Sequence, residues 1–291
     1  MQGIDLPQLE ALAAVVDEGS FDAAALRLNV TPSAISQRVK AFETAIGAVL
    51  LQRSKPVRVT EAGVPYLRLA QQIRTLVAEA TTYGGGDGVV TVPIAVNGDS
   101  LNTWVLPALA RLSEAMDFDI RREDQGRSAE LLRQGVVMAA VTASPDAVQG
   151  CSVTRLGIMR YRPMCSPDFR NRWLSDGPSG GALARAPMVV FDRSDDLQDR
   201  YLAQWGGPRQ PGRRHHVPSS ADFAEAVRLG LGWAVLPRQQ SAQWEAEGRL
   251  VDIAPTTGLD VTLYWQQWKV RTAALARLSD VIVTAARAAL D

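Results

Sequence analysis

The chain has 291 residues, and its 31 basic and 31 acidic side chains give a formal net charge of zero, which over the whole length argues against a nucleic-acid partner. No apolar run approaches about 18 residues and residues 1–6 carry no charged-then-apolar leader, so we expect a cytoplasmic protein without membrane contact. The adjacent His215 and His216 and two Cys fourteen residues apart provide neither a hydrolytic triad nor a zinc site. The sequence therefore predicts that the chain is not an enzyme and holds no metal and no cofactor.

Residues 1–60 follow the pattern of a helix-turn-helix. Asp5 begins a helix whose apolar residues recur every three or four positions and which ends near Gly19. Ser20 caps a second, short helix, and only Asn29 and Val30 separate that helix from the cap of a third. A second and third helix joined by so short a turn are typical of proteins that place the later helix in the DNA major groove.

The third helix, over residues 32–46, carries the most informative pattern. Thr31 is its predicted N-cap, Pro32 suits the first helical position, and Gly47 ends it. One face is apolar, with Ile35, Val39, Phe42 and Ile46 at helical spacing. The opposite face carries hydroxyl, amide and cationic groups, from Ser33, Ser36, Gln37 and Lys40. One side is therefore expected to pack on the domain while the other reads a DNA groove.

A small basic hairpin is predicted after this helix. Residues 49–51 and 57–59 have strand character, and the cationic tip between them is expected to contact the phosphate backbone as a wing. Charge counted locally supports this, because residues 27–58 hold six basic side chains and one carboxylate. The predicted DNA-contacting residues are Thr31, Pro32, Ser33, Ser36, Gln37, Arg38, Lys40, Arg53 and Lys55. A solvated surface helix in a bundle is the alternative for the third helix taken alone.

A longer helix is predicted from Thr60 to Tyr83. Apolar residues at alternating spacings of three and four form a coiled-coil stripe, which predicts a dimer interface made by Tyr66, Leu69, Ile73 and Leu76. Docking of this helix on its own domain is the alternative. Pro65 removes one amide from the helical ladder, so the helix either kinks or begins late. The glycine-rich residues 84–88 then predict a flexible joint.

From residue 89 the chain alternates strands and helices. Strands are expected at 89–96, 118–123, 136–142, 188–191, 215–217, 233–236 and 261–268. Helices are expected from Ser100, from Ser128, after the later strands and, at the C-terminus, from Ala273. This alternation predicts a mostly parallel sheet covered by helices on both faces and folded as two lobes with a cleft between them. Ligands in such sheets bind at the carboxyl ends of the strands.

Polar side chains gather at the predicted strand ends. Asn97, Asp99 and Ser100 lie at a helix N-terminus, where unpaired amides favour an anion such as an α-carboxylate. Acidic residues follow other strands, so a cationic side chain is the expected complement. The predicted effector-binding residues are Asn97, Asp99, Ser100, Glu123, Asp124, Thr142 and Asp192, with Asp195 and Asp196 beside them. The set favours a small zwitterion with a basic side chain, lysine first and then arginine or histidine. Helix capping is the alternative for each single carboxylate.

The N-terminal residues resemble the signature of LysR-type transcriptional regulators. The matching positions run without a gap and are Phe21, Ala24, Ala25, Leu28, Thr31 to Gln37, Glu43, Gly47, Leu51, Arg53 and Thr60 to Gly63. The order of the later elements also fits the family, so the resemblance covers the whole chain. Residues 97–109, 123–125 and 217–220 resemble the ArgP/LysG branch, whose members sense basic amino acids and control their export. The last of these stretches adds Ser219 to the predicted effector-binding residues.

The resemblance implies a domain order and an activity. Residues 1–60 are expected to form an all-α winged helix-turn-helix, 61–88 a linker and dimerisation helix with its glycine hinge, and 89–291 a two-lobed, periplasmic-binding-like α/β effector domain. Lobe I takes about 89–163 and 267–291, and lobe II about 164–266. The family implies a homodimer or homotetramer that binds double-stranded operator DNA, responds to a small effector, and contacts RNA polymerase indirectly. This branch further implies activation of an amino-acid exporter gene. A family member that senses another metabolite is the main alternative, and an orphan amino-acid-binding protein or an enzyme is the more distant one.

Overall fold

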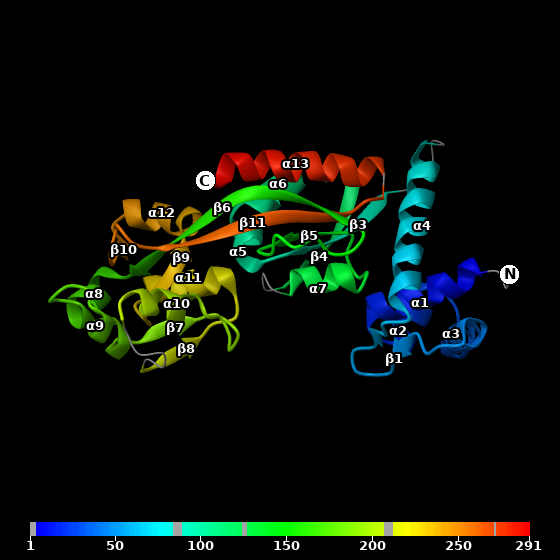
Figure 1. Ribbon diagram of the computed structural model, residues 1–291, viewed down its shortest axis with the longest axis horizontal. Helices are drawn as coiled ribbons and strands as arrows, with labels where there is room; N and C mark the ends of the chain where they lie inside the picture. The colour runs from blue at the N-terminus through cyan, green and yellow to red at the C-terminus, as the bar shows by residue number, and fades with distance from the viewer. Residues whose placement is uncertain (1–3, 84–88, 124–126, 207–211, 271) are drawn as a thin grey trace. The chain divides into compact units, whose positions relative to one another are not determined.

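A computed structural model of the chain describes residues 4–83, 89–123, 127–206, 212–270 and 272–291 (Figure 1). The chain divides into two compact units, each assembled from separate stretches of sequence. Unit 1 comprises Met1–Val96, Ala110–Thr154 and Trp265–Val281, and unit 2 comprises Asn97–Leu109, Arg155–Tyr264 and Ile282–Asp291. Unit 1 thus holds the N-terminal domain together with part of the α/β region. The lobe boundaries expected from the sequence stay a prediction.

The N-terminal domain is built from three helices and a hairpin. Its elements are α1 (Leu6–Glu18), α2 (Phe21–Arg27), α3 (Pro32–Ile46), β1 (Leu51–Gln52) and β2 (Arg58–Val59). Gly19 and Gly47 end α1 and α3 with φ of 70° and 77°, a conformation that glycine adopts without strain. The inner faces of the helices form one apolar core that includes Leu12, Ile35 and Phe42. This confirms the predicted winged helix-turn-helix, with strands shorter than expected.

The linker helix α4 (Val64–Tyr83) begins four residues later than predicted. Thr60 explains part of the delay, because its Oγ1 accepts a hydrogen bond from the Gly63 amide at 3.2 Å and forms a turn before the helix. Pro65 lies in the first turn, where the amide it lacks has no partner within the helix. The late start was one of the two alternatives, and the glycine joint at 84–88 lies outside the described residues.

Unit 1 contains a parallel sheet. Its strands include β3 (Val90–Val96), β4 (Met116–Arg122) and β5 (Ala139–Thr142), and α7 (Ser128–Arg133) connects the last two. β3 lies between β4 and β5 and pairs with both in parallel, with Val96 opposite Arg122 at one edge. The carboxyl ends of the three strands therefore meet at the same edge, as the sequence predicted.

Unit 2 is organised around a strand that the sequence did not predict. β6 (Cys151–Cys165) continues from unit 1 into unit 2, where β9 (Ala234–Pro237) and β10 (Val251–Asp252) pair with it antiparallel. β7 (Met188–Val190) and β8 (Arg214–His216) form a separate parallel pair. The helices are α5 (Gly98–Ser100), η1 (Leu101–Val105), α6 (Leu106–Ala110), α8 (Pro167–Trp173), α9 (Gly180–Arg185), α10 (Leu197–Gln204), α11 (Ser220–Arg228) and α12 (Arg238–Ala246). The antiparallel pairs add to the mostly parallel arrangement that the sequence predicts.

The chain ends with one more strand and one more helix. β11 (Leu259–Trp268) runs from unit 2 back into unit 1, and the C-terminal helix α13 (Ala273–Ala289) follows it. Both elements match the predicted positions. Among the described residues, no helix is long and apolar enough to cross a membrane.

Candidate functional site

The ends of α3 are set by the residues that the sequence singled out. Thr31 Oγ1 accepts a hydrogen bond from the Ala34 amide at 3.2 Å, and Pro32 occupies the first turn. At the other end the Gly47 amide donates to the Glu43 carbonyl at 2.8 Å. A helix fixed at both ends holds its side chains in constant register, which a recognition element requires.

One face of α3 is buried and the other meets solvent. Ile35, Val39 and Phe42 are 2% exposed or less, so the apolar face is committed to the domain core. On the other side Thr31, Pro32, Ser33, Gln37 and Lys40 are exposed, and Ser36 and Arg38 are half-buried. Hydroxyl and amide groups of this kind donate to and accept from base edges in the major groove. The predicted DNA-reading surface is therefore accessible, and its contacts with bases stay a prediction.

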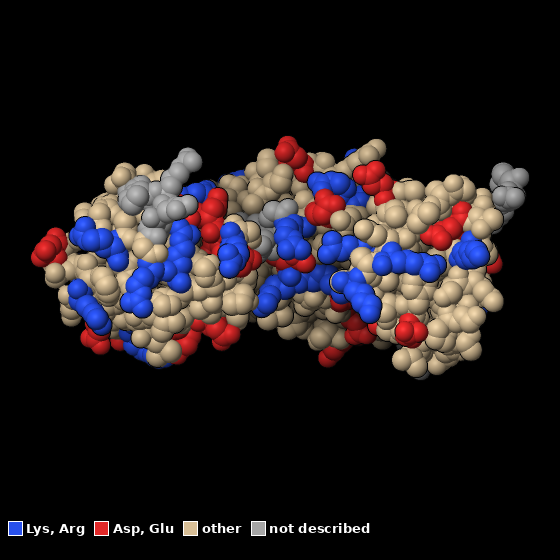
Figure 2. Space-filling model, turned by 90° about the horizontal axis from the view of Figure 1, so that it is seen from below, with Lys and Arg blue, Asp and Glu red and all other residues tan. Residues whose placement is uncertain are grey.

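The wing carries exposed positive charge. Arg53, Lys55 and Arg58 are exposed on the hairpin, and the Arg53 guanidinium lies 5.6 Å from the centre of the Phe21 ring. Figure 2 shows Lys and Arg side chains interspersed with Asp and Glu on one face of the molecule. Arg27 does not belong to this basic surface, because it pairs with Asp17 at 3.0 Å and Glu18 at 3.2 Å. The local excess of positive charge is thus smaller than counted from the sequence.

The predicted dimer stripe on α4 is only partly exposed. Tyr66, Leu69 and Ile73 pack against the core of their own N-terminal domain, and the Tyr66 ring meets Phe42 edge to face with centroids 5.2 Å apart. Leu76 is 48% exposed, and its neighbour Val77 is 58% exposed. Docking on the chain's own domain therefore accounts for the first half of the stripe. The second half remains available for a partner helix, and dimerisation through it stays a prediction.

Some predicted effector-binding residues lie at the carboxyl edge of the unit 1 sheet. Glu123 follows β4, donates its amide to the Val96 carbonyl at 3.3 Å and pairs with Arg127 at 3.3 Å. Thr142 ends β5 fully buried, and its Oγ1 donates to the Ser144 carbonyl at 3.2 Å. Asp124 lies outside the described residues. These side chains occupy the edge at which open α/β sheets bind ligands.

A second group surrounds Asp99 in unit 2. α5, η1 and α6 form one continuous helical stretch from Gly98 to Ala110, and Asp99 lies in its first turn. The Asp99 carboxylate accepts hydrogen bonds from the Tyr161 hydroxyl and the Ser220 hydroxyl, each at 2.7 Å. Burial raises the pKa of Asp99 above its ordinary value, and the bonds from Ser220 and Tyr161 offset part of that rise. Burial therefore makes the ionised form of the Asp99 carboxyl group costly in free energy, and a cation beside it would offset that cost.

Two polar atoms beside Asp99 lack hydrogen-bond partners among the described residues. Asn97 is 3% exposed and Ser100 is fully buried, yet Asn97 Oδ1 and Ser100 Oγ make no hydrogen bond. Buried polar groups are nearly always paired in folded proteins, because an unpaired group costs about 1–3 kcal/mol. Both atoms flank Asp99 in the chain, where they are available to a polar ligand.

The acidic residues after β7 have local roles. Asp192 Oδ1 accepts from the Ser194 amide at 2.7 Å, and Asp195 accepts from the Phe191 and Leu197 amides at 2.8 and 3.1 Å. Asp196 occupies the N-cap position of α10 and pairs loosely with Arg200. Asp192 and Asp195 thus accept hydrogen bonds from nearby amides, whereas Asp196 makes no side-chain capping bond. Burial still raises the pKa of Asp195, and the charge of Asp99 contributes to that rise.

Tyr161 and Ser220, the two hydrogen-bond partners of Asp99, were not among the site residues predicted from the sequence. Ser219, which was predicted instead of Ser220, occupies the N-cap position of α11 without a side-chain capping bond. The role of Ser219 in effector binding stays a prediction, and its neighbour Ser220 is the residue that contacts Asp99. Tyr161 lies on β6. Because the sequence did not predict that strand, no signal placed Tyr161 near Asp99. The described residues contain no group of three His, Cys, Asp or Glu that could hold a metal ion.

Comparisons with known proteins cover both domains. The LysR-family pattern of bacterial regulatory helix-turn-helix proteins matches residues 6–64, and the LysR substrate binding domain matches residues 89–287. The chain is 46% identical over 286 residues to the HTH-type transcriptional regulator LysG of Mycobacterium tuberculosis, covering 97% of this chain and 94% of that protein. It is 42% identical over 287 residues to the lysine export transcriptional regulatory protein LysG of Corynebacterium efficiens, covering 97% and 98%. Full-length LysG from Corynebacterium glutamicum, solved with bound effector Arg, matches with a TM-score of 0.77 and 36% identity over 99% of both chains.

Proposed function

The chain belongs to the LysR family of bacterial transcriptional regulators, in the LysG/ArgP branch, and we propose that it senses a basic amino acid and activates an amino-acid exporter gene. Its relatives are named as transcriptional regulators, which agrees with the expectation that the chain is not an enzyme. The arrangement around Asp99 is the observation that carries the proposal for the effector. Bound Arg in the C. glutamicum relative supports the same class of ligand.

The polar site matches the chemistry of a basic amino acid. Ser100 Oγ and the start of the helical stretch suit an α-carboxylate, because helix N-termini favour anions. Asp99 suits an ammonium group, which supplies the opposite charge that its buried carboxylate lacks. The acidic residues after β4, of which Glu123 is described, stay the sequence-predicted partners of the cationic end of the effector side chain. Lysine and arginine carry the cationic side chain that this arrangement requires. A neutral amino acid would leave the acidic residues after β4 without a cationic partner.

The N-terminal domain supplies the DNA contact in this proposal. α3 lies in the major groove with Ser33, Ser36 and Gln37 toward the bases, and Arg53 and Lys55 of the wing contact phosphates. Two copies joined through α4 place two reading helices on the half-sites of a roughly palindromic operator. Pairing of such dimers through their effector domains gives the tetramer.

Effector and DNA are linked through two arrangements of the assembly. A ligand shifts an equilibrium only by its difference in affinity for the two states, so the basic amino acid must bind one arrangement more tightly. The favoured arrangement changes the placement of the DNA-binding domains and, indirectly, contact with RNA polymerase. A regulator with the same architecture that senses a different small metabolite is the alternative.

Calorimetry on two variants tests the proposed polarity of the site. Ser100→Ala should weaken binding of every amino-acid ligand, because it removes the Ser100 hydroxyl, which would donate a hydrogen bond to the ligand's α-carboxylate. Glu123→Gln should weaken lysine and arginine selectively, and each change should cost roughly tenfold or more in affinity. Glu114→Gln is the matched control, since Glu114 is an exposed carboxylate of the same unit. Wild-type protein that binds neither basic amino acid contradicts the proposal, as does unchanged lysine affinity in Glu123→Gln.

A further inference from the structure

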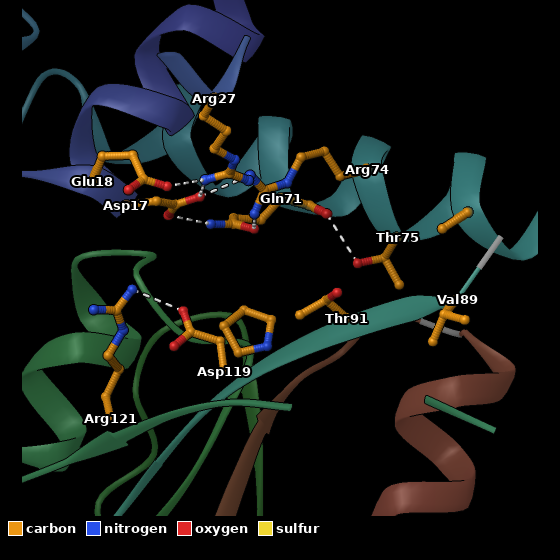
Figure 3. A pocket seen from close by; sticks show the side chains of 12 residues that line it. Asp17, Glu18, Arg27, Gln71, Arg74, Thr75, Val89, Thr91, Asp119 and Arg121 are labelled. Atoms are coloured by element: carbon orange, nitrogen blue, oxygen red, sulfur yellow. Dashed lines mark hydrogen bonds and ion pairs between the residues drawn. The ribbon is translucent and has the colours of Figure 1, made fainter. Parts of the chain in front are cut away.

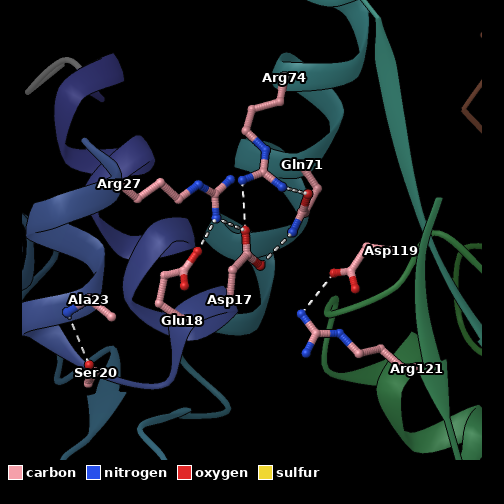
Figure 4. Close-up of polar contacts among 9 residues, drawn as sticks. All are labelled: Asp17, Glu18, Ser20, Ala23, Arg27, Gln71, Arg74, Asp119 and Arg121. Carbon is pink, nitrogen blue, oxygen red and sulfur yellow. Dashed lines mark hydrogen bonds and ion pairs between the residues drawn. The ribbon is translucent and has the colours of Figure 1, made fainter. Parts of the chain in front are cut away.

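The linker helix α4 is firmly joined to the DNA-binding domain. Leu67 and Ala70 are buried in that domain's apolar core. Asp17 on α1 accepts hydrogen bonds from Gln71 Nε2 at 3.3 Å and from the Arg74 guanidinium at 2.8 Å (Figure 4). Arg27 on α2 reaches the same carboxylate at 3.0 Å. Apolar packing and a shared, largely buried carboxylate make α4 and the helix-turn-helix one body.

The junction of α4 with the rest of unit 1 differs from its junction with the DNA-binding domain. Here side chains of α4 make hydrogen bonds to the ends of the helices α7 and α13. The Arg68 guanidinium donates to the carbonyl oxygens of Leu132 and Arg133 at 3.1 and 2.9 Å, at the end of α7. Carbonyls in a last helical turn lack partners within the helix and favour a cation. Gly135 makes room for this contact, since a Cβ there would lie 2.6 Å from Arg68 Cγ.

Glu79 makes the complementary contact at a helix beginning. Its Oε1 accepts a hydrogen bond from the Ala274 amide at 2.8 Å, in the first turn of α13. That amide has no partner within its own helix, and the N-terminal end favours an anion. Arg68 and Glu79 are eleven residues apart, which is about three turns, so they lie on one face of α4. Between them Thr75 Oγ1 lies 3.3 Å from Met138 Sδ, just before β5.

Beside these contacts the junction is open and polar. A pocket of about 490 Å³ separates α1, α2 and α4 from β3 and β4 (Figure 3). Asp119 and Arg121 on β4 pair with each other at 2.8 Å, while Asp17 pairs with Arg27 and Arg74 on the opposite wall. Among the described residues that line the pocket, each of these ion pairs stays on its own wall. Val136, just before β5, also packs against the core that includes Leu67 and Ala70, and the open, polar part of the junction resists displacement less than a close-packed core does.

The proposed function already requires the DNA-binding domain to change its placement, and we propose that Arg68 and Glu79 are the positioning residues that hold α4 and the helix-turn-helix, as one arm, in the arrangement seen here on the rest of unit 1. β5 runs from this joint to Thr142, a predicted effector-binding residue, since it begins after Met138 and ends at Thr142. Effector binding at the carboxyl end of the strand biases the helix-end contacts at its beginning, which changes the direction of the arm. This mechanism rests on the proposed function, because it requires effector binding. The contacts of Arg68 with α7 and of Glu79 with α13 are present without an effector.

The first test measures the joint without any effector. In the full-length chain, Glu79→Ala should speed amide hydrogen exchange over residues 272–276 by about tenfold or more, because the Ala274 amide loses its acceptor. Glu79→Gln keeps an acceptor oxygen and should retain most of the protection, and the exposed Glu114→Gln serves as control. Residues 283–289 of α13 should be unaffected. Equal exchange in wild type and Glu79→Ala overturns the inference whether or not an amino acid binds.

The second test measures coupling between effector and DNA. Fluorescence anisotropy gives the operator Kd with and without arginine, and the ratio of the two is the coupling, typically about 5- to 150-fold in allosteric proteins. In Arg68→Gln/Glu79→Ala the ratio should fall to within about twofold of one, while Arg277→Gln on the exposed face of α13 keeps the wild-type ratio. Glu79→Gln should recover part of the coupling. Wild-type coupling in the double variant overturns the inference, whereas a wild-type protein that does not bind arginine overturns the proposed function instead.

Discussion

Replacing Asp99 with Asn removes a negative charge from the polar site and leaves its size unchanged. The carboxylate accepts hydrogen bonds from Tyr161 and Ser220, each at 2.7 Å. In the variant Asn Oδ1 accepts one of these hydroxyls, and the other hydroxyl rotates to accept from Nδ2. The network therefore survives, and any change in effector affinity reports the lost charge.

The variant should gain stability at neutral pH. Burial raises the pKa of Asp99 in the folded chain above its unfolded value. A carboxyl of this kind contributes stability that is fully present below the unfolded pKa and is lost as pH rises through the folded pKa. Asn has no such dependence, so the free energy of unfolding of Asp99→Asn should equal that of wild type in acid and exceed it near pH 7. Each tenfold difference in proton affinity corresponds to about 1.4 kcal/mol.

Effector affinity should change in the opposite direction. A charged hydrogen bond contributes about 1.5–3 kcal/mol, so loss of the Asp99 charge should weaken arginine binding roughly tenfold to a hundredfold. Urea unfolding from about pH 4 to about pH 8 and calorimetry with arginine measure the two effects. Asp280→Asn on the exposed face of α13 controls for loss of surface charge. A destabilised Asp99→Asn at neutral pH, or one that binds arginine as wild type does, refutes the reasoning.

Three further predictions concern DNA binding and assembly. Gln37→Ala should lose about 1–3 kcal/mol of discrimination between operator and random DNA, and an unchanged ratio of the two affinities in a competition assay means that α3 is wrongly oriented. Arg53→Ala/Lys55→Ala should weaken binding to all DNA and reduce the slope of log K against log salt by about two, because each removes one phosphate contact; an unaltered slope places the wing outside the interface. Leu76→Asp/Val77→Asp introduces charge on the exposed part of α4 and should yield monomers by light scattering without loss of unfolding free energy, whereas a persistent dimer locates the interface elsewhere.

Elements with local signals were predicted closely. The bounds of α3 follow from Thr31, Pro32 and Gly47, each of which acts on adjacent backbone. The strands β3 and β5 and the start of α13 were also placed within a few residues, because apolar runs bounded by polar turns specify them. β6 was missed because Gly157 and Pro163 interrupt its apolar pattern, and its antiparallel partners come much later in the chain.

The polar site could be predicted only in part. Asn97, Asp99 and Ser100 adjoin one strand end, so the sequence brings them together. The partners of Asp99 are 62 and 121 residues away, and no local spacing relates Tyr161 or Ser220 to it. Asp192 and Asp195 have the right chemistry, but nearby amides satisfy them in a turn. The ion pair between Arg27 and Asp17 could not be predicted from the sequence either, because it depends on how α1 and α2 pack against each other.

In the proposed function, a basic amino acid changes how this regulator binds DNA. Fluorescence anisotropy with DNA from its own upstream region, and with random DNA of the same length, measures specific binding with and without arginine or lysine. We predict a preference for the upstream DNA and a change in its Kd of about fivefold or more with either basic amino acid, and no change with a neutral one. Equal affinity for both DNAs, or an operator Kd that neither arginine nor lysine alters, would contradict the account.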